Sequence, residues 1–181
     1  MRQLQIFCIG LLLSVSTVSA QNINKGVRIS GDVLAVGIPV AALATTLIEK
    51  DYQGTKQLFF SGATSLAATY LLKVAVRKER PDGSNKYSFP SAHTAAAFTG
   101  ATFLQRRYGW KLGVPAYILS TYVAWSRVYA KKHDIWDVAA GAALGVAGSF
   151  VFTRPFAAKH RLAFSPTMID DKAGVYFSFD F

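Results

Sequence analysis

Five apolar segments with almost no charged residues constrain most strongly what this chain can fold into. They are rich in Ala, Gly, Thr and Val and apolar around most of their circumference, as helices are when they are buried on every side. A chain of 181 residues cannot build a core that buries five such helices completely, so a lipid bilayer is the expected surrounding. The segments are Val33 to Ile48, Leu58 to Val76, Ala95 to Leu104, Leu112 to Trp125 and Val138 to Phe152.

These segments predict an all-α, membrane-embedded bundle of about five to six helices. The third and fourth segments fall short of the roughly 20 residues that span a bilayer unless polar flanks are included, so a soluble, Ala-rich periplasmic bundle is the alternative. Frequent small residues suit close packing of helices in either setting. They are Gly62, Ala63, Ala67, Ala68, Gly100, Gly141, Gly145 and Gly148.

The two ends of the chain read differently from the helical region 21–160. Residues 1–20 combine Arg2, an apolar run and the small residues before Gln21, which predicts a signal peptide or, alternatively, an uncleaved first helix. Either interpretation puts Gln21 outside the cytoplasm. Residues 161–181 end in "VYFSFDF", whose alternation of apolar and polar residues is typical of a strand. We therefore expect a short β-like tail, such as a small hairpin.

Three polar stretches fall on the same, outer side when the chain is threaded through a membrane from an external Gln21. They are "KVAVRKERP" (Lys73–Pro81), "SFPSAHT" (Ser88–Thr94) and "SRVYAKKHDIWD" (Ser126–Asp137). Each stands at the end of a predicted helix. This coincidence predicts that the three stretches form one site.

The first two stretches predict an anion-binding site. Lys73 and Arg80 are seven residues apart, so a continuing helix would put them on one face, with Arg80 near the helix end because Pro81 follows. Basic residues that merely reach the membrane interface are the alternative. Ser91 is a natural N-cap for the Ala-rich helix after it, which leaves the N–H groups of Ala92, His93 and Thr94 free to bind an anion.

The third stretch predicts an oriented histidine. Arg127 and His133 are six residues apart and cannot share one helical face, so a turn must separate them. We expect Arg127 to end one helix and His133 to begin the next. His133 and Asp137 would then lie on one face, where the carboxylate accepts a hydrogen bond from Nδ1–H and leaves Nε2 free. A simple ion pair is the alternative.

Together the stretches suit a tetrahedral oxyanion during in-line displacement at phosphorus. His133 would attack phosphorus and His93 would protonate the departing oxygen, giving a phosphohistidine that water then hydrolyses. A metal cofactor fits poorly among so many cations, and we expect none. The formal charge of +10 does not indicate nucleic acid binding, because the chain is predicted to be exported and its basic residues lie at helix ends.

The pattern K-x6-R-P, P-S-x-H and S-R-x5-H-x3-D resembles that of the type 2 phosphatidic acid phosphatase superfamily, over about residues 57–153. The resemblance implies that His133 is the nucleophile, His93 the general acid and Asp137 the residue that orients His133. It implies that phosphate is bound by Lys73, Arg80, Ser91, Arg127 and the amide of Ala92. Ala92 stands where the family usually has Gly. Phosphatases of this family use no metal.

The predicted function is hydrolysis of a lipid phosphate or pyrophosphate at the periplasmic face of a bacterial inner membrane. A soluble periplasmic acid phosphatase for small phosphomonoesters is the alternative, and the resemblance also admits a vanadate-dependent haloperoxidase. A basic membrane protein that only binds anionic lipid is the non-enzymatic alternative.

Overall fold

The bundle predicted from the sequence is present in the computed structural model, which describes residues 23–156, 162–169 and 172–179. The helices are α2 (Ile23–Ile48), α3 (Tyr52–Val76), α4 (Ala92–Tyr108), α5 (Trp110–Tyr129) and α6 (Ile135–Phe152). They are longer than the predicted apolar segments because the polar residues that flank each segment are also helical. The predicted signal peptide lies outside the described residues.

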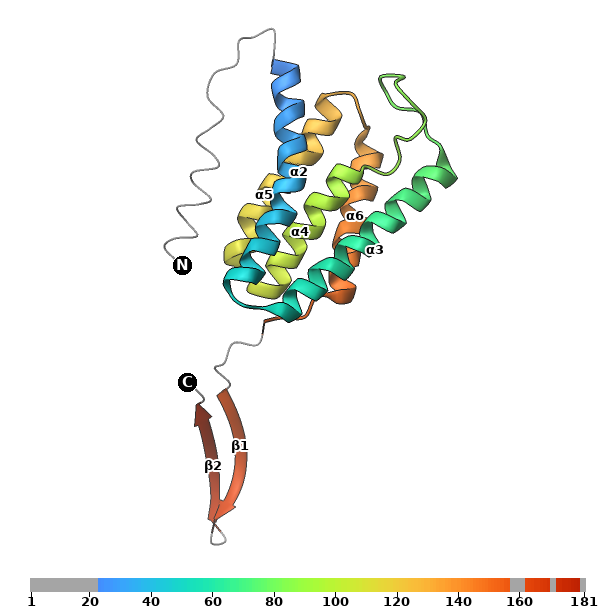
Figure 1. Ribbon diagram of the computed structural model, residues 1–181. Coiled ribbons are helices and arrows are strands. Elements are labelled where there is room, and N and C mark those ends of the chain that lie inside the picture. The colour runs from blue at the N-terminus through green and yellow to red at the C-terminus, as the bar shows by residue number, and fades with distance from the viewer. Residues whose placement is uncertain (1–22, 157–161, 170–171, 180–181) are drawn as a thin grey trace.

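Helix α4 occupies the centre of the bundle and contacts each of the other helices that the structure describes (Figure 1). It begins at the N-cap Ser91 and ends at Gly109, whose φ of 91° favours glycine. Most of its buried side chains are small or weakly polar, and Phe103, Leu104 and Arg107 are the larger ones. A central helix of this composition lets its neighbours approach closely.

Small residues on α6 form the closest of these contacts. Added Cβ atoms at Gly141, Gly145 and Gly148 would overlap with α4, its N-cap or α3, at Ser91, Ala95 and Ser65 respectively. The predicted role of these glycines in close helix packing is confirmed. Gly62 has open space around it instead.

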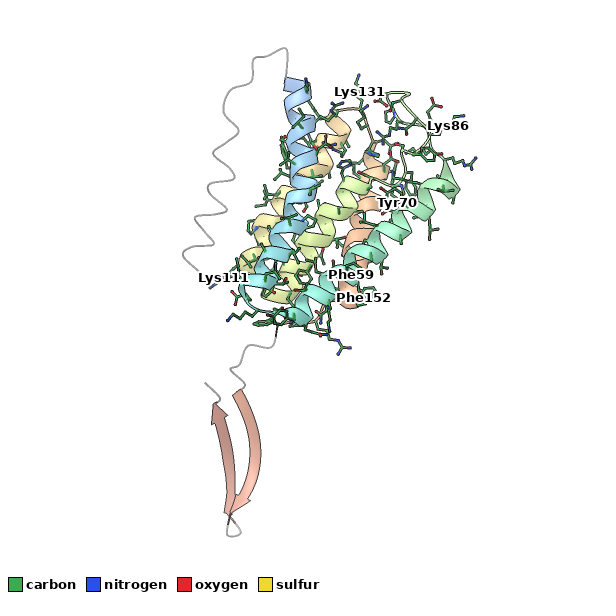
Figure 2. All side chains as sticks on the ribbon, viewed as in Figure 1. Phe59, Tyr70, Lys86, Lys111, Lys131 and Phe152 are labelled. Carbon is green, nitrogen blue, oxygen red and sulfur yellow. The ribbon has the colours of Figure 1, made fainter. Side chains whose placement is uncertain are left out.

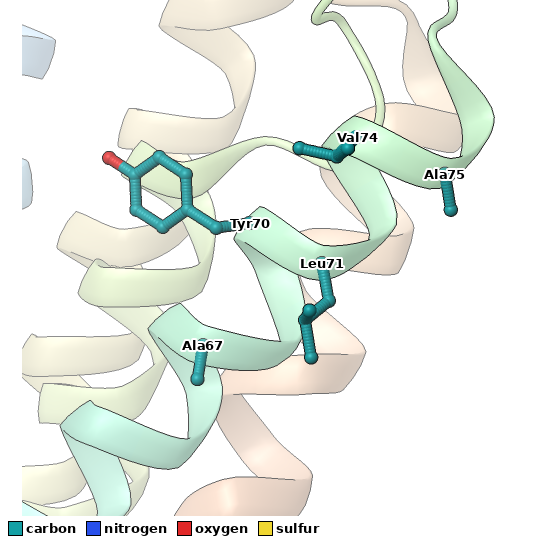
Figure 3. A pocket seen from close by; sticks show the side chains of 5 residues that line it. All are labelled: Ala67, Tyr70, Leu71, Val74 and Ala75. Atoms are coloured by element: carbon teal, nitrogen blue, oxygen red, sulfur yellow. The ribbon is translucent and has the colours of Figure 1, made fainter.

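The outer surface of the bundle is apolar, which confirms a membrane-embedded fold. Within the described residues, three helices are long and apolar enough to span a membrane: α2 from Lys25, α3 and α6. Large apolar side chains such as Val36 (65% exposed) and Leu71 (72% exposed) point away from the core, as expected for a lipid-facing surface. An open hollow of about 550 Å³ on α3 belongs to this lipid-facing surface, and its lining side chains include Tyr70, Leu71 and Val74 (Figure 3).

The tail contains the predicted β structure. Strand β1 (Leu162–Ile169) pairs antiparallel with β2 (Lys172–Phe179), with Leu162 opposite Phe179. The alternating residues Val175, Phe177 and Phe179 lie on β2, and Phe181 lies outside the described residues. The strand expected from the sequence is β2, whereas its partner β1 carried no such pattern.

A buried ion pair fastens the end of the bundle where α2 turns into α3. Asp51 caps α3 by accepting from Gly54 N at 2.8 Å. Its two carboxylate oxygens also accept from Arg107 Nε and Nη2, both at 2.6 Å, and from the Tyr108 hydroxyl at 2.8 Å. Arg107 further donates to the carbonyl of Arg154 at 2.8 Å. These contacts join the last turn of α4 to the start of α3 and to the chain that follows α6.

Candidate active site

The three polar stretches meet at one end of the bundle, as predicted. The C-terminal ends of α3 and α5 and the N-terminal ends of α4 and α6 lie there (Figure 1), and Figure 2 places Lys86 and Lys131 at this end and Lys111 at the opposite one. A pocket of about 180 Å³ opens among them. It is lined by Arg28, Asp32, Arg80, His93, Arg127, Lys132 and His133.

The N-terminus of α4 has the predicted geometry except at Thr94, whose N–H was expected to be free and is instead capped. Ser91 is its N-cap, and the buried Ser91 hydroxyl accepts from the N–H of Thr94 at 3.4 Å and from the Thr94 hydroxyl at 3.0 Å. Ala92 and His93 are the first helical residues, so their N–H groups have no partner within the helix. Ala92 does not have a positive φ. The side chain that replaces the usual glycine is therefore accommodated without backbone strain.

Lys73 and Arg80 lie at the same end of the bundle, but Lys73 holds a loop whereas Arg80 lines the pocket. Helix α3 stops at Val76 and Arg77 adopts a left-handed conformation (φ 48°), so the expectation that the helix runs to Arg80 was wrong. Lys73 Nζ donates to the carbonyls of Tyr87 (2.9 Å) and Pro90 (2.6 Å) and so holds the loop before α4. Arg80 lines the pocket, and its buried Nε has no hydrogen-bond partner among the described residues.

Arg127 stands in the last turn of α5 and points into the pocket. It is 3% exposed, donates to the carbonyl of Arg28 at 2.6 Å and is ion-paired with Asp32. The same oxygen of Asp32 lies 3.1 Å from His93 Nε2. The carboxylate thus links the cation of α5 to the histidine of α4.

Three residues that no motif indicated also line the pocket: Arg28, Asp32 and Lys132. Asp32 was recognisable as a lone carboxylate at the edge of an apolar segment, where an ionisable residue is usually functional. The first apolar segment of the sequence begins only at Val33, whereas α2 already begins at Ile23. Arg28 and Asp32 therefore belong to a helix that is packed against the site.

The geometry around His133 corrects two expectations. His133 lies in the loop before α6 and does not begin the helix, because Asp134 takes the N-cap position. The predicted hydrogen bond to Asp137 is also not formed, since His133 Nδ1 lies 3.5 Å from Asp137 Oδ2 and is buried without a partner among the described residues. Asp137 instead accepts from Lys78 Nζ at 2.8 Å, from the Ser88 hydroxyl and from Asp134 N at 3.1 Å.

Burial and the positive charges around the pocket keep His133 neutral. Burial, followed by the positive charges of Lys73 and Arg80, lowers the pKa of His133 from 6.5 to about 4. Its imidazole therefore carries a lone pair at neutral pH. Lys132 is ion-paired with Asp82, while Arg80 has no carboxylate partner in the described part of the chain. The pocket is thus cationic and contains a neutral, buried imidazole.

No group of three or more His, Cys, Asp or Glu side chains suited to a metal ion occurs in the described part of the chain. The expectation of a metal-free site remains a prediction.

A helical membrane enzyme with a small, cationic pocket is the class of protein that the fold and the site define. Residues 54–161 match the model of the PAP2 superfamily. The chain belongs to this superfamily, which confirms the resemblance found in its motifs.

The relatives are phosphatases. The chain is 29% identical to the lipid A 4′-phosphatase of Helicobacter pylori over an alignment of 197 residues that covers 99% of both proteins. It is 36% identical over 77 residues to the lipid A 1-phosphatase of Porphyromonas gingivalis, which covers 41% of this chain and 17% of that protein. The phosphatase class predicted from the sequence is confirmed.

A solved structure shares the fold. The crystal structure of Aquifex aeolicus LpxE superimposes with a TM-score of 0.63 at 20% identity, covering 79% of this chain and 92% of that one.

Proposed function

We propose that this protein hydrolyses the phosphate or pyrophosphate group of a membrane lipid through a phosphohistidine intermediate, at the periplasmic face of the inner membrane. The observation that carries the proposal is the convergence of Arg80, Arg127, His93 and His133 on one pocket of about 180 Å³, at the end of a bundle whose outer faces are apolar. The names of the two relatives make the phosphates of lipid A the first candidates.

In the proposed first step, the Nε2 lone pair of His133 attacks phosphorus while the bond from phosphorus to the leaving oxygen breaks. His93 donates its proton to that oxygen. The charge on the equatorial oxygens is stabilised by Arg80, Arg127 and the free N–H groups at the start of α4. The low pKa of His133 supports its role as nucleophile, because the neutral form is the reactive one.

In the second step, water attacks the phosphohistidine and gives a proton to His93, and the electron pair of the phosphorus–nitrogen bond returns to His133. The buried carboxylate of Asp137 lies 3.5 Å from His133 Nδ1. It would stabilise the positive charge that the ring carries while Nε2 is phosphorylated. Ser88 and Lys78 hold this carboxylate in place.

A lipid substrate is favoured by what surrounds the pocket. Exposed apolar side chains reach this end of the bundle at Ile29 (46% exposed), Ile135 (63%) and Trp136 (73%). Trp is enriched where a protein crosses the membrane interface. The phosphate would enter the pocket from the headgroup region while the acyl chains stay in the bilayer.

The first experiment measures phosphate release by detergent-purified protein with excess EDTA. The panel contains lipid A, phosphatidate, a polyprenyl pyrophosphate and the soluble ester 4-nitrophenyl phosphate. We expect EDTA-resistant release from a lipid that is lost in His133→Ala and retained in Lys111→Ala, a control at the opposite end of the bundle. Release abolished by EDTA, or unchanged in His133→Ala, would refute the mechanism. Release from the soluble ester alone would favour a phosphatase for small phosphomonoesters.

The proposed sidedness has a separate test. Cys8 is the only cysteine, so a Cys8→Ser background allows single cysteines to be placed at the exposed positions Lys86 and Lys111. A membrane-impermeant maleimide added to spheroplasts should label Lys86→Cys and spare Lys111→Cys. The reverse pattern would place the active site in the cytoplasm.

A further inference from the structure

We propose that Asp32 is a positioning residue that makes His93 an effective general acid. This inference rests on the proposed function, in which His93 protonates the leaving oxygen. It starts from one contact that no motif predicted: Asp32 Oδ1 is ion-paired with Arg127 and lies 3.1 Å from His93 Nε2.

The contact with Asp32 fixes the orientation of a ring that is otherwise weakly held. The His93 side chain is 44% exposed, and Asp32 is its only polar side-chain partner among the described residues. With the Nε2 proton held by the carboxylate, the Nδ1 proton is the one available to a leaving oxygen. After that proton is transferred, the ring remains neutral with Nε2–H still bound to Asp32.

The charge of Asp32 also favours the form of His93 that the reaction needs. Burial, and then the positive charges of Arg127, Arg80 and Lys73, lower the pKa of His93 and oppose its protonation. Asp32 is the carboxylate that acts in the opposite direction. A general acid must carry its proton when the substrate binds, so a carboxylate at this position has a chemical purpose beyond pairing with Arg127.

The packing of α2 is adapted to deliver this carboxylate. Gly31 lies so close to α5 that an added Cβ would overlap with the Ser126 hydroxyl and with Arg127 Nη2. Without a side chain at Gly31, Arg127 can reach both Asp32 and the carbonyl of Arg28. The same turn of α2 thus brings Asp32 to the histidine.

The alternative is that Asp32 is only a structural partner of Arg127. The two roles differ in how they depend on the leaving group. A general acid matters most when the departing oxygen is strongly basic, whereas phosphate binding by Arg127 affects every ester alike. We would therefore measure kcat/KM for benzyl phosphate, whose alkoxide is a poor leaving group, and for 4-nitrophenyl phosphate, whose phenolate leaves readily. This parameter covers the steps up to phosphorylation of His133.

Asp32→Asn should lower kcat/KM for benzyl phosphate by about 10-fold or more, within the range that general acid catalysis supplies. The loss for 4-nitrophenyl phosphate should be several-fold smaller, and Asp32→Glu should recover part of the activity on benzyl phosphate. Asp82→Asn is the matched control, because it removes another carboxylate paired with a cation at this end. It should leave the ratio between the two esters unchanged.

An equal loss on both esters, or no loss, in a folded Asp32→Asn protein would overturn the inference. Thermal melting in detergent shows whether Asp32→Asn has folded. If it has not, the ratio of kcat/KM between the two esters is measured in Asp32→Glu instead. His93→Ala separates this inference from the proposed function. If His93→Ala shows no dependence on the leaving group, the assignment of His93 as general acid fails. If it shows that dependence and the Asp32 variants do not, only the role of Asp32 fails.

Discussion

The imidazole of His133 should stay neutral well below neutral pH, which determines where the enzyme loses activity in acid. Burial and then the charges of Lys73 and Arg80 lower the pKa of His133 to about 4. At pH 5 a group with this pKa is about 90% neutral, whereas a histidine with the ordinary pKa of about 6.5 is about 3% neutral. The reactive form at pH 5 is therefore about thirty times more abundant than an ordinary histidine would provide.

The assay is the pH dependence of kcat/KM between pH 3.5 and 8. The second ionisation of the substrate phosphate, near pH 6, is measured separately by phosphorus NMR and divided out. After this correction, we expect the loss of kcat/KM in acid to have its midpoint well below pH 6.5. Arg80→Gln removes a cation that opposes protonation, so its limb should move to higher pH, whatever happens to its maximal rate. A wild-type limb at about pH 6.5 that Arg80→Gln does not move would refute the reasoning.

Three further predictions concern stability and catalysis. Arg107→Met leaves the Asp51 carboxylate buried without its cation, so the free energy of unfolding should fall by about 3–5 kcal/mol; melting in detergent would measure this, and adding Asp51→Asn should restore part of it. Gly145→Leu forces α6 away from α4 at Ala95 and should cost at least about 1–3 kcal/mol, whereas Gly62→Leu, with open space around it, should melt like the wild type. Asp137→Asn should reduce kcat by about 100-fold or more while inorganic phosphate still binds as a competitive inhibitor; unchanged turnover would show that its charge is dispensable.

The sequence predicted the helices and the end of the bundle at which the site forms because charged residues are rare inside this chain. Lys73, Ser91 and Arg127 stand out at the ends of apolar segments. Because successive helices cross the bundle in opposite directions, the ends that carry these residues lie on the same side. The alternation near Phe177 and Phe179 likewise predicted strand β2, since side chains alternate faces along a strand.

The details of hydrogen bonding could not be predicted, because several groups compete for the same partner. Asp134 and His133 both precede α6, and the shorter side chain of Asp134 caps the helix. Asp137 had three donors available besides His133, and these occupy its oxygens. Asp32 was missed because its partners Arg127 and His93 come from helices far along the chain, a proximity that only the packing of α2 creates.

The small volume of the pocket has a consequence for inhibitor design. A space of about 180 Å³ holds a phosphate and little else. Compounds that only fill this space would therefore also bind many other phosphate-binding proteins in the same cell. A selective compound must instead gain its affinity along the lipid-facing sides of the helices, with a modest anion as its anchor. Partition into the bilayer would then count as part of its potency, and measurements in detergent alone would rank such compounds in the wrong order.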